Sequence, residues 1–204
     1  TAKILKKTAV ISRDTPGFVV NRVLAKVLGE AMNAVDTGTT FETVDHALDR
    51  IGLPMTPFEL LELVGLKVGA HVLDTHHKAF PERFFESENL HRLADYGKLY
   101  DRDGKGRAKG FDKKAVQIVA GGKTPMTAAS FAERVEVGLA DEIKRMLDDQ
   151  VVAAAEDIDL CLILGAGYPF QAGGITPYLD RIGASEKAFG GTFHTPPIRG
   201  AASR

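Results

Sequence analysis

The chain has 204 residues, of which 44% are hydrophobic, an ordinary share for a folded protein with a buried core. Its 26 Lys and Arg residues nearly balance its 27 Asp and Glu residues, which argues against a general attraction to nucleic acid or anionic membranes. No apolar stretch approaches the ~20 residues that span a bilayer, and no signal-peptide pattern opens the chain. We therefore expect a soluble, cytoplasmic protein.

The chain offers no complete set of residues for catalysis or metal binding. Its single cysteine, Cys161, excludes an internal disulfide and lies in an apolar run, so we expect a small buried residue rather than a nucleophile. The six histidines lack metal-ligand spacing, and we expect them at surfaces or interfaces. No Ser-His-Asp or Cys-His arrangement is indicated either.

Residues 8–12 predict one short strand, followed by a helix. A single strand cannot satisfy its own backbone groups, so its sheet is expected to come from a partner or to lie upstream. Asp14 and Thr15 are candidate N-caps, and Pro16 suits the first helical position. Apolar residues then recur at three- and four-residue spacing, which predicts a helix that ends near Gly38.

Four more helices follow, each bounded by capping residues, glycine or proline. They are predicted from Thr39 to Gly52, from Thr56 to Gly65, from Leu66 to Phe80 and from Ser87 to Gly97. The spacings of Thr39 with Glu42 and of Thr56 with Glu59 fit the capping box.

Residues 97–126 mix glycines with many Lys and Arg residues, which predicts a loop. We consider three roles for it: a solvated linker, which we favour, a site for the phosphates of a nucleotide-like ligand, or a nucleic-acid surface. The last lacks the aromatic residues that usually stack on bases. From Thr127 a long helical pattern returns, and the tail from about Gly190 is expected to lie on the surface or be disordered.

Two nucleotide-binding patterns begin in the sequence and fail. The segment Gly122-Lys123-Thr124 has Gln117 where a phosphate-binding loop requires glycine. The segment Gly165-Ala166-Gly167 follows a helical pattern, and Phe170 occupies the place of the last glycine. We therefore expect this chain to bind no cofactor by itself.

An internal repeat relates residues 30–65 to residues 142–183. Five positions carry the alignment: Glu30 with Glu142, Asp36 with Asp148, Asp45 with Asp159, Pro54 with Pro169, and Gly65 with Gly183. The sequence thus predicts an all-α fold of two tandem helical units that pack through pseudo-symmetric apolar faces.

Asn21 is the polar residue that stands out in the first predicted helix. It lies one turn ahead of Leu24, near the apolar face. Its amide both donates and accepts hydrogen bonds, so it needs partners if it is buried. From the residues alone, a structural hydrogen bond is the favoured role.

Two longer motifs carry a family resemblance. Residues 14–22, DTPGFVVNR, resemble the junction between the NAD-binding and helical domains of 3-hydroxyacyl-CoA dehydrogenases. Residues 52–65 resemble the G-x-P-M-G-P-F-E-L-x-D-x-V-G segment of that family, with Thr56 in place of a glycine and Glu62 in place of the aspartate. Residues 156–174 are similar to the degenerate second repeat of multifunctional fatty-acid-oxidation enzymes. The G-K-G-F-Y turn of the family has no clean counterpart.

The resemblance implies a division of the chain. Residues 1–13 would hold the last strand and junction of a missing Rossmann domain, residues 14–126 the first helical unit with the basic loop, and residues 127–204 the second, degenerate unit with the tail. Both units would resemble the C-terminal domain of 6-phosphogluconate dehydrogenase. They would pair as a homodimer or as an intramolecular pseudo-dimer.

The resemblance also implies an activity, namely oxidation of a 3-hydroxyacyl-CoA by NAD in fatty acid β-oxidation. The NAD site and a catalytic His–Glu pair would lie upstream, so we expect the isolated chain to be inactive. Asn21 would hold the acyl carbonyl of the substrate, whereas the second copy has Glu133-Arg134-Val135 where the first has Val20-Asn21-Arg22, and so no matching asparagine. The alternative function is a free-standing helical scaffold or oligomerisation module without catalysis.

Overall fold

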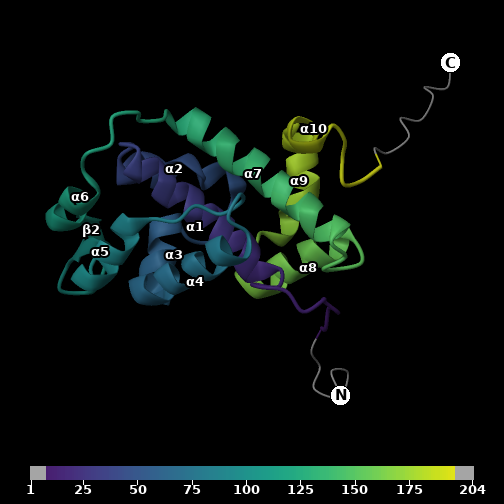
Figure 1. Ribbon diagram of the computed structural model, residues 1–204, viewed down its shortest axis with the longest axis horizontal. Coiled ribbons are helices and arrows are strands. Elements are labelled where there is room, and N and C mark those ends of the chain that lie inside the picture. The colour runs from purple at the N-terminus through teal and green to yellow at the C-terminus, as the bar shows by residue number, and fades with distance from the viewer. Residues whose placement is uncertain (1–7, 196–204) are drawn as a thin grey trace.

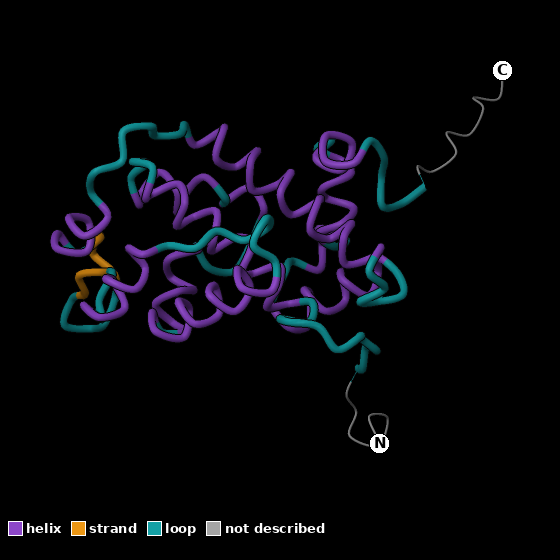
Figure 2. The backbone as a smooth tube through the Cα atoms, viewed as in Figure 1, coloured by secondary structure: helices purple, strands orange, loops and turns teal. Residues whose placement is uncertain are grey.

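Helices dominate residues 8–195, the part of the chain that the computed structural model describes (Figure 2). The α-helices are α1 (Val20–Asp36), α2 (Phe41–Ala47), α3 (Pro57–Val64), α4 (Leu66–Ala79), α5 (Glu88–Tyr96), α6 (Lys113–Val119), α7 (Ala128–Asp148), α8 (Ala155–Ala166), α9 (Ile175–Arg181) and α10 (Ala184–Phe189). Two 3-10 turns, η1 (Asp49–Ile51) and η2 (Phe170–Ala172), and two strands, β1 (Tyr100–Arg102) and β2 (Ala108–Phe111), complete the set. The predicted all-α class is confirmed.

Several helix starts lie where capping chemistry predicted them. At α3, the Thr56 hydroxyl accepts the Glu59 N–H and the Glu59 carboxylate accepts the Thr56 N–H, so the capping box is complete. The Ser87 side chain caps α5 and that of Thr127 caps α7. These caps join residues three positions apart, so the local sequence is enough to predict them.

The cap predicted at Thr39 is wrong. The N-cap of α2 is Thr40, whose hydroxyl accepts the backbone N–H of Thr43 at 3.2 Å. Thr39 instead accepts the backbone N–H of Met126 at 2.9 Å. Its hydroxyl therefore joins the end of α1 to the segment before α7, a long-range contact that local spacing does not reveal.

The strand predicted at residues 8–12 is also absent, and the first helix begins later than expected. Residues 8–13 have no regular secondary structure, although the Arg13 N–H donates to the Val151 carbonyl at 2.8 Å. A strand requires a ladder of such bonds, and no partner strand lies beside this segment within residues 8–195. Gly17 and Phe18 adopt positive φ angles of 76° and 48°, so α1 starts only at Val20.

Residues 97–126 contain regular structure where a loop was predicted. Strands β1 and β2 form an antiparallel hairpin, and Asp112 caps α6 through the N–H groups of Lys114 and Ala115. The Asp103 carboxylate closes the hairpin turn by accepting the N–H groups of Lys105 and Arg107. The many glycines and charges of this segment hid its two structural signals, which are aspartates whose side chains accept backbone N–H groups of the residues that follow them.

The two longest helices, α1 and α7, pack against each other in the middle of the molecule. In Figure 1, α3–α6 lie to one side of this pair and α8–α10 to the other. Fully buried apolar side chains fill the space between them, including Met32 from α1 and Phe131 and Ile143 from α7. We call α1–α6 the first repeat and α7–α10 the second repeat. No helix between residues 8 and 195 combines the length and apolarity that a bilayer crossing requires.

The two repeats exchange equivalent ion pairs. The ungapped alignment of Glu30 with Glu142 shifts the predicted register at the start of the repeat by one residue, so that Arg22 pairs with Arg134 and Asn21 with Glu133. In the structure, Arg22 bonds to Glu142 at 2.5 Å, and Arg134 bonds to Glu30 at 2.6 Å. Each arginine thus reaches the glutamate of the opposite repeat, as expected for units related by a pseudo-two-fold axis.

A second reciprocal contact joins the turns after η1 and α8. A Cβ placed on Gly52 would lie 3.1 Å from Cγ of Pro169, and one on Gly167 would lie 3.4 Å from Cγ of Pro54. These four residues are the Gly and Pro pairs of the repeat. The turns therefore pack on each other across the same axis as the arginine–glutamate pairs.

Each repeat also ends in a segment bound to its own third helix by a carboxylate. Glu62 accepts the backbone N–H groups of residues 99–100, both at 3.2 Å. Asp180, three residues before Gly183 as Glu62 is three before Gly65, accepts those of residues 193–194, both at 3.0 Å. The start of the tail is therefore bound at the surface, while residues 196–204 lie outside the described range.

Candidate substrate-binding site at the start of α1

A left-handed turn at Gly17 and Phe18 sets the direction of α1. A Cβ on Gly17 would lie 2.1 Å from Nε2 of His76 on α4, so only glycine fits this position. Phe18 follows with its ring 53% exposed. Because the turn ends one residue before the helix, it fixes which residues of the first helical turn face outward.

Asn21 lies on the outward face of this first turn. Its side chain is exposed, and it lines a hollow of about 240 Å³ with Val10, Ser12, residues 17–20 and Cys161. Within residues 8–195 its amide forms no side-chain hydrogen bond that would fix it structurally. Asn21 therefore borders a space large enough for part of a small ligand, and its amide can both donate and accept hydrogen bonds.

The next residue, Arg22, points the opposite way and is fully buried. Its Nε donates to Oε1 of Glu142, which is also buried and also receives Nη1 of Arg83 at 3.2 Å. The Phe80 ring lies between the two guanidinium groups, 4.4 Å from that of Arg22 and 4.6 Å from that of Arg83. Residues from α1, the α4–α5 connection and α7 thus meet directly beneath Asn21.

His76 closes the other side of this cluster. Its Nδ1 donates to the Val72 carbonyl at 2.7 Å, which leaves Nε2 as an unprotonated acceptor, buried and without a hydrogen-bond partner. Burial lowers the pKa of His76, and the positive charge of Arg22 lowers it further. His76 is therefore neutral and shielded from any substrate, and it does not supply a general base to the hollow.

Cys161 is half-buried on α8 and lines the hollow beside Val20, so it is less enclosed than predicted. Burial raises the pKa of its thiol. A thiol with a raised pKa carries little thiolate and is a poor nucleophile. The structure agrees with the prediction that Cys161 does not act as one.

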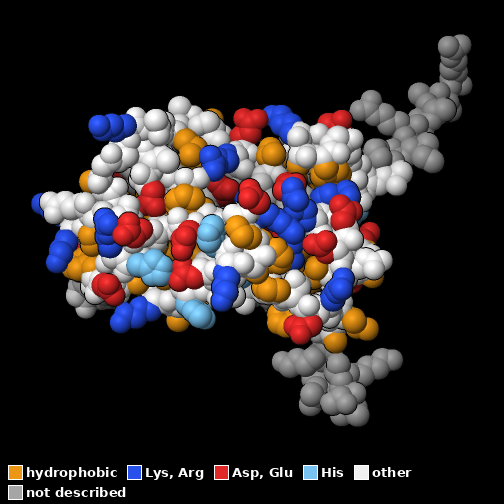
Figure 3. Space-filling model, in the orientation of Figure 1, with side chains coloured by type: hydrophobic (Ala, Val, Ile, Leu, Met, Phe, Trp, Pro, Cys, Tyr) orange, Lys and Arg blue, Asp and Glu red, His pale blue; other side chains and the backbone are white. Residues whose placement is uncertain are grey.

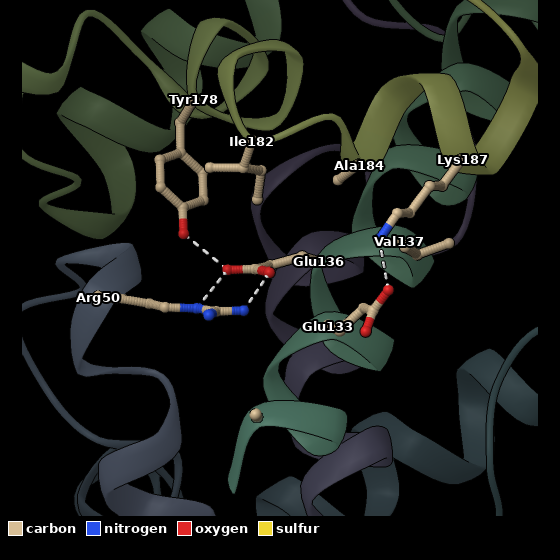
Figure 4. Close-up of a pocket in the computed structure, with 9 residues that line it drawn as sticks. Arg50, Glu133, Glu136, Val137, Tyr178, Ile182, Ala184 and Lys187 are labelled. Atoms are coloured by element: carbon tan, nitrogen blue, oxygen red, sulfur yellow. Dashed lines mark hydrogen bonds and ion pairs between the residues drawn. The ribbon is translucent and has the colours of Figure 1, made fainter.

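A second, charged pocket of about 320 Å³ lies between η1, α7, α9 and α10 (Figure 4). At its centre the buried Glu136 carboxylate accepts two N–H groups of Arg50, at 2.8 and 2.5 Å, and the hydroxyl of Tyr178 at 2.6 Å. On its rim, Lys187 bonds to Glu133, which the repeat alignment pairs with Asn21. The charges of this pocket neutralise each other, so it joins the repeats rather than attracting an ionic ligand.

Sequence reasoning missed the Glu136 cluster. Glu136 directly follows Val135 on the buried side of α7, and a carboxylate in that position signals a partner. The sequence does not show that the partners are Arg50, from the other repeat, and Tyr178.

Three cations of the basic loop are paired with carboxylates, whereas Lys105, Lys109, Lys113 and Lys123 form no ion pair within residues 8–195. Lys98 bonds to Asp101 and Asp112, Arg102 pairs with Glu62, and Arg107 pairs with its own turn aspartate. Across the face in Figure 3, Lys and Arg side chains alternate with Asp and Glu. In the described part of the chain, no three His, Cys, Asp or Glu side chains gather as a metal site would require.

Comparison with known proteins assigns the region around Asn21 to a protein family. Residues 17–110 match the family described as 3-hydroxyacyl-CoA dehydrogenase, C-terminal domain. These residues form a 3-hydroxyacyl-CoA dehydrogenase C-terminal domain. The matched range begins at Gly17, so Asn21 and the hollow lie at the very edge of this domain, where the preceding residues join it.

Relatives and a solved structure extend the similarity of this dehydrogenase domain to α7–α10. The fatty acid oxidation complex subunit alpha of Acinetobacter baumannii (strain SDF) is 32% identical over 202 residues, and that of Acinetobacter baylyi is 31% identical. The alignments cover 91% of this chain, which spans 28% of the length of these relatives. The 3-hydroxybutyryl-CoA dehydrogenase of Escherichia coli K12 shares the fold, with a TM-score of 0.65 and 18% identity over 95% of this chain and 60% of that one.

Proposed function

We propose that this chain is the substrate-binding and assembly part of an NAD-dependent (S)-3-hydroxyacyl-CoA dehydrogenase of fatty acid β-oxidation. The whole enzyme would oxidise a 3-hydroxyacyl-CoA to a 3-oxoacyl-CoA. In this proposal, residues 1–13 lead in from the Rossmann domain, residues 14–126 form the substrate-facing unit, and residues 127–204 form a second unit that pairs with it. The family match and the named relatives support the assignment.

One observation carries the proposal: the unbonded amide of Asn21 at the mouth of an apolar hollow. Its N–H groups are free to donate to the carbonyl of an acyl-CoA and orient the reacting carbon. Val10, Phe18 and Val20 provide apolar surface for acyl methylenes. The site thus suits one polar anchor and a short apolar chain, which is the chemistry of an acyl thioester near its reacting end.

We place the NAD site outside residues 8–195. The most similar pattern, Gly165-Ala166-Gly167, closes the C-terminal end of α8, with Gly167 at a φ of 71°. A dinucleotide pyrophosphate requires the N-terminal end of a helix, where free N–H groups point at the anion. The hollow also lacks a general base, because His76 is buried and Cys161 remains a thiol. Cofactor and base would both come from the Rossmann domain.

Calorimetric titration of this chain with acetoacetyl-CoA and, separately, with NADH tests the proposal. We expect the CoA ester to bind and NADH not to bind. The Asn21→Ala variant should bind the ester about fivefold more weakly, because it loses one hydrogen bond of roughly 1 kcal/mol. The control is Asn33→Ala, which alters an asparagine on the same helix about 18 Å further along its axis.

Three results would count against the proposal. NAD-dependent turnover of acyl-CoA by the pure chain would place the catalytic groups within it. Binding of neither ligand would favour a scaffold or oligomerisation module without a substrate site. Equal ester affinity of the Asn21→Ala variant and the unaltered chain would show that Asn21 does not contribute to binding of the ester.

A further inference from the structure

The ion pair beneath Asn21 lies at a helix start that has no side-chain cap. The N-cap position of α1, Val19, offers no side-chain hydrogen bond, and the first turn contains no acidic residue. Helices that begin this way leave their first N–H groups without local support. Arg22, in the first turn, is instead anchored by Glu142, with both side chains at most 1% exposed.

Glu142 belongs to α7 and therefore to the second repeat. It also binds Arg83, and it lies across the cluster from His76, whose ring contacts the Gly17 turn. Arg22 and Arg83 thus converge on this one carboxylate below the first turn of α1. Glu142 does not line the hollow, so it has no direct route to a ligand there.

The equivalent pair in the other direction has a different setting. Arg134 is 47% exposed where it meets Glu30, and α7 has its own N-cap in Thr127. Glu133, the counterpart of Asn21, is bound to Lys187 on the rim of the charged pocket (Figure 4). The Arg134–Glu30 pair therefore supports no exposed, unbonded side chain.

We propose that Glu142 is a positioning residue for the Asn21 site. Through Arg22 it fixes the first turn of α1, so that the Asn21 amide points into the hollow. The second repeat, which has no asparagine of its own at this position, thereby completes the site of the first. This inference rests on the proposed function of Asn21.

A double-mutant cycle in the full dehydrogenase that contains this chain tests the inference. We expect Glu142→Ala to lower kcat about ten- to a hundredfold with a smaller change in KM, because Asn21 loses its alignment in the reacting complex. Asn21→Ala should lower kcat by a similar factor. If Glu142 acts through Asn21, adding Glu142→Ala to Asn21→Ala should cost almost nothing more.

The matched control is Arg134→Ala, which removes the reciprocal pair and leaves α1 unaltered. It should lower the free energy of unfolding but leave kcat unchanged, because Arg134 lies in the second turn of α7, where no site is proposed. Thermal unfolding of each variant separates loss of fold from loss of alignment. Should Glu142→Ala not fold, Glu142→Gln replaces it in the same cycle, since glutamine keeps the acceptor and the size but loses the charge.

The outcomes separate the two proposals. Folded Glu142 variants with unaltered kcat, or with effects that simply add to that of Asn21→Ala, would overturn the positioning role and leave the role of Asn21 intact. An unaltered kcat in Asn21→Ala alone would instead remove the proposed function on which this inference rests.

Discussion

At Gly17, the lack of space for a Cβ atom determines which amino acid the site can hold. A left-handed φ alone favours glycine at many turns of this chain, but at Gly17 the neighbouring His76 ring also fills the place of a Cβ. The sequence motif contains the glycine but not the reason for it, since His76 lies on another helix. Contacts of this kind determine side-chain identity without leaving a local pattern.

We expect Gly17→Ala to be more destabilising than backbone strain alone explains. The matched control is Gly97→Ala, where φ is 83° and nothing lies within 4 Å of the added Cβ. That control should cost about 1–2 kcal/mol of unfolding free energy, the usual penalty of a left-handed alanine. Gly17→Ala should cost more, because the His76 ring must move, and urea denaturation of both variants measures the difference. Equal losses would show that the contact is easily relieved.

His76 should also make stability depend on pH. Its pKa in the folded protein is lowered from 6.5, chiefly by burial, whereas the unfolded chain keeps the ordinary value. Above pH 6.5 both states hold the ring neutral, so the free energy of unfolding is at its full value. Below it the unfolded chain binds a proton that the folded protein excludes, and stability falls until the pH reaches the folded-state pKa.

Urea denaturation on both sides of pH 6.5 measures this effect. The His76→Gln variant should flatten the pH dependence, because glutamine does not titrate. The His71→Gln variant alters an exposed histidine of the same helix and should preserve it. A pH dependence that survives in His76→Gln would assign the effect to other groups.

At the scale of elements, the sequence predicted what depends on near neighbours. The caps at Thr56 and Ser87 are confirmed because each joins residues three positions apart. The cap predicted at Thr39 was wrong because that hydroxyl binds a distant backbone group. The strand predicted at residues 8–12 was wrong because the described part of the chain provides no strand beside it. The hairpin within residues 97–126 was missed because its organising aspartates were read as part of a charged loop.

The segments that close the two repeats give a test at this scale. Asp180 accepts the N–H groups of residues 193–194, so Asp180→Ala leaves both groups to water. Their amide hydrogen exchange should accelerate about ten- to a hundredfold, as expected for bonds to a charged acceptor. The control Asp141→Ala removes an exposed pair with Arg145 and should leave residues 193–194 protected. Unchanged exchange in Asp180→Ala would mean that other contacts hold this segment.

For the whole molecule, the repeat in the sequence predicted two similar helical units but not the way they support each other. Alignment placed Glu30 opposite Glu142, yet a pattern of identities does not say which arginine each glutamate binds. Asn21 was identified from its motif, whereas Arg22 and Glu142, 120 residues apart, acquire their roles only through folding. Long-range ion pairs of this kind lie beyond the reach of local spacing.

The reciprocal arginine–glutamate pairs have a consequence for how such a protein can change. In a homodimer one codon specifies the same residue on both faces of the interface, so any substitution alters both at once. Here the two repeats that form the interface are encoded separately in one chain. Each repeat therefore has its partner beside it at any protein concentration. One copy can therefore hold a bonded glutamate at position 133 while the other keeps an open asparagine at position 21.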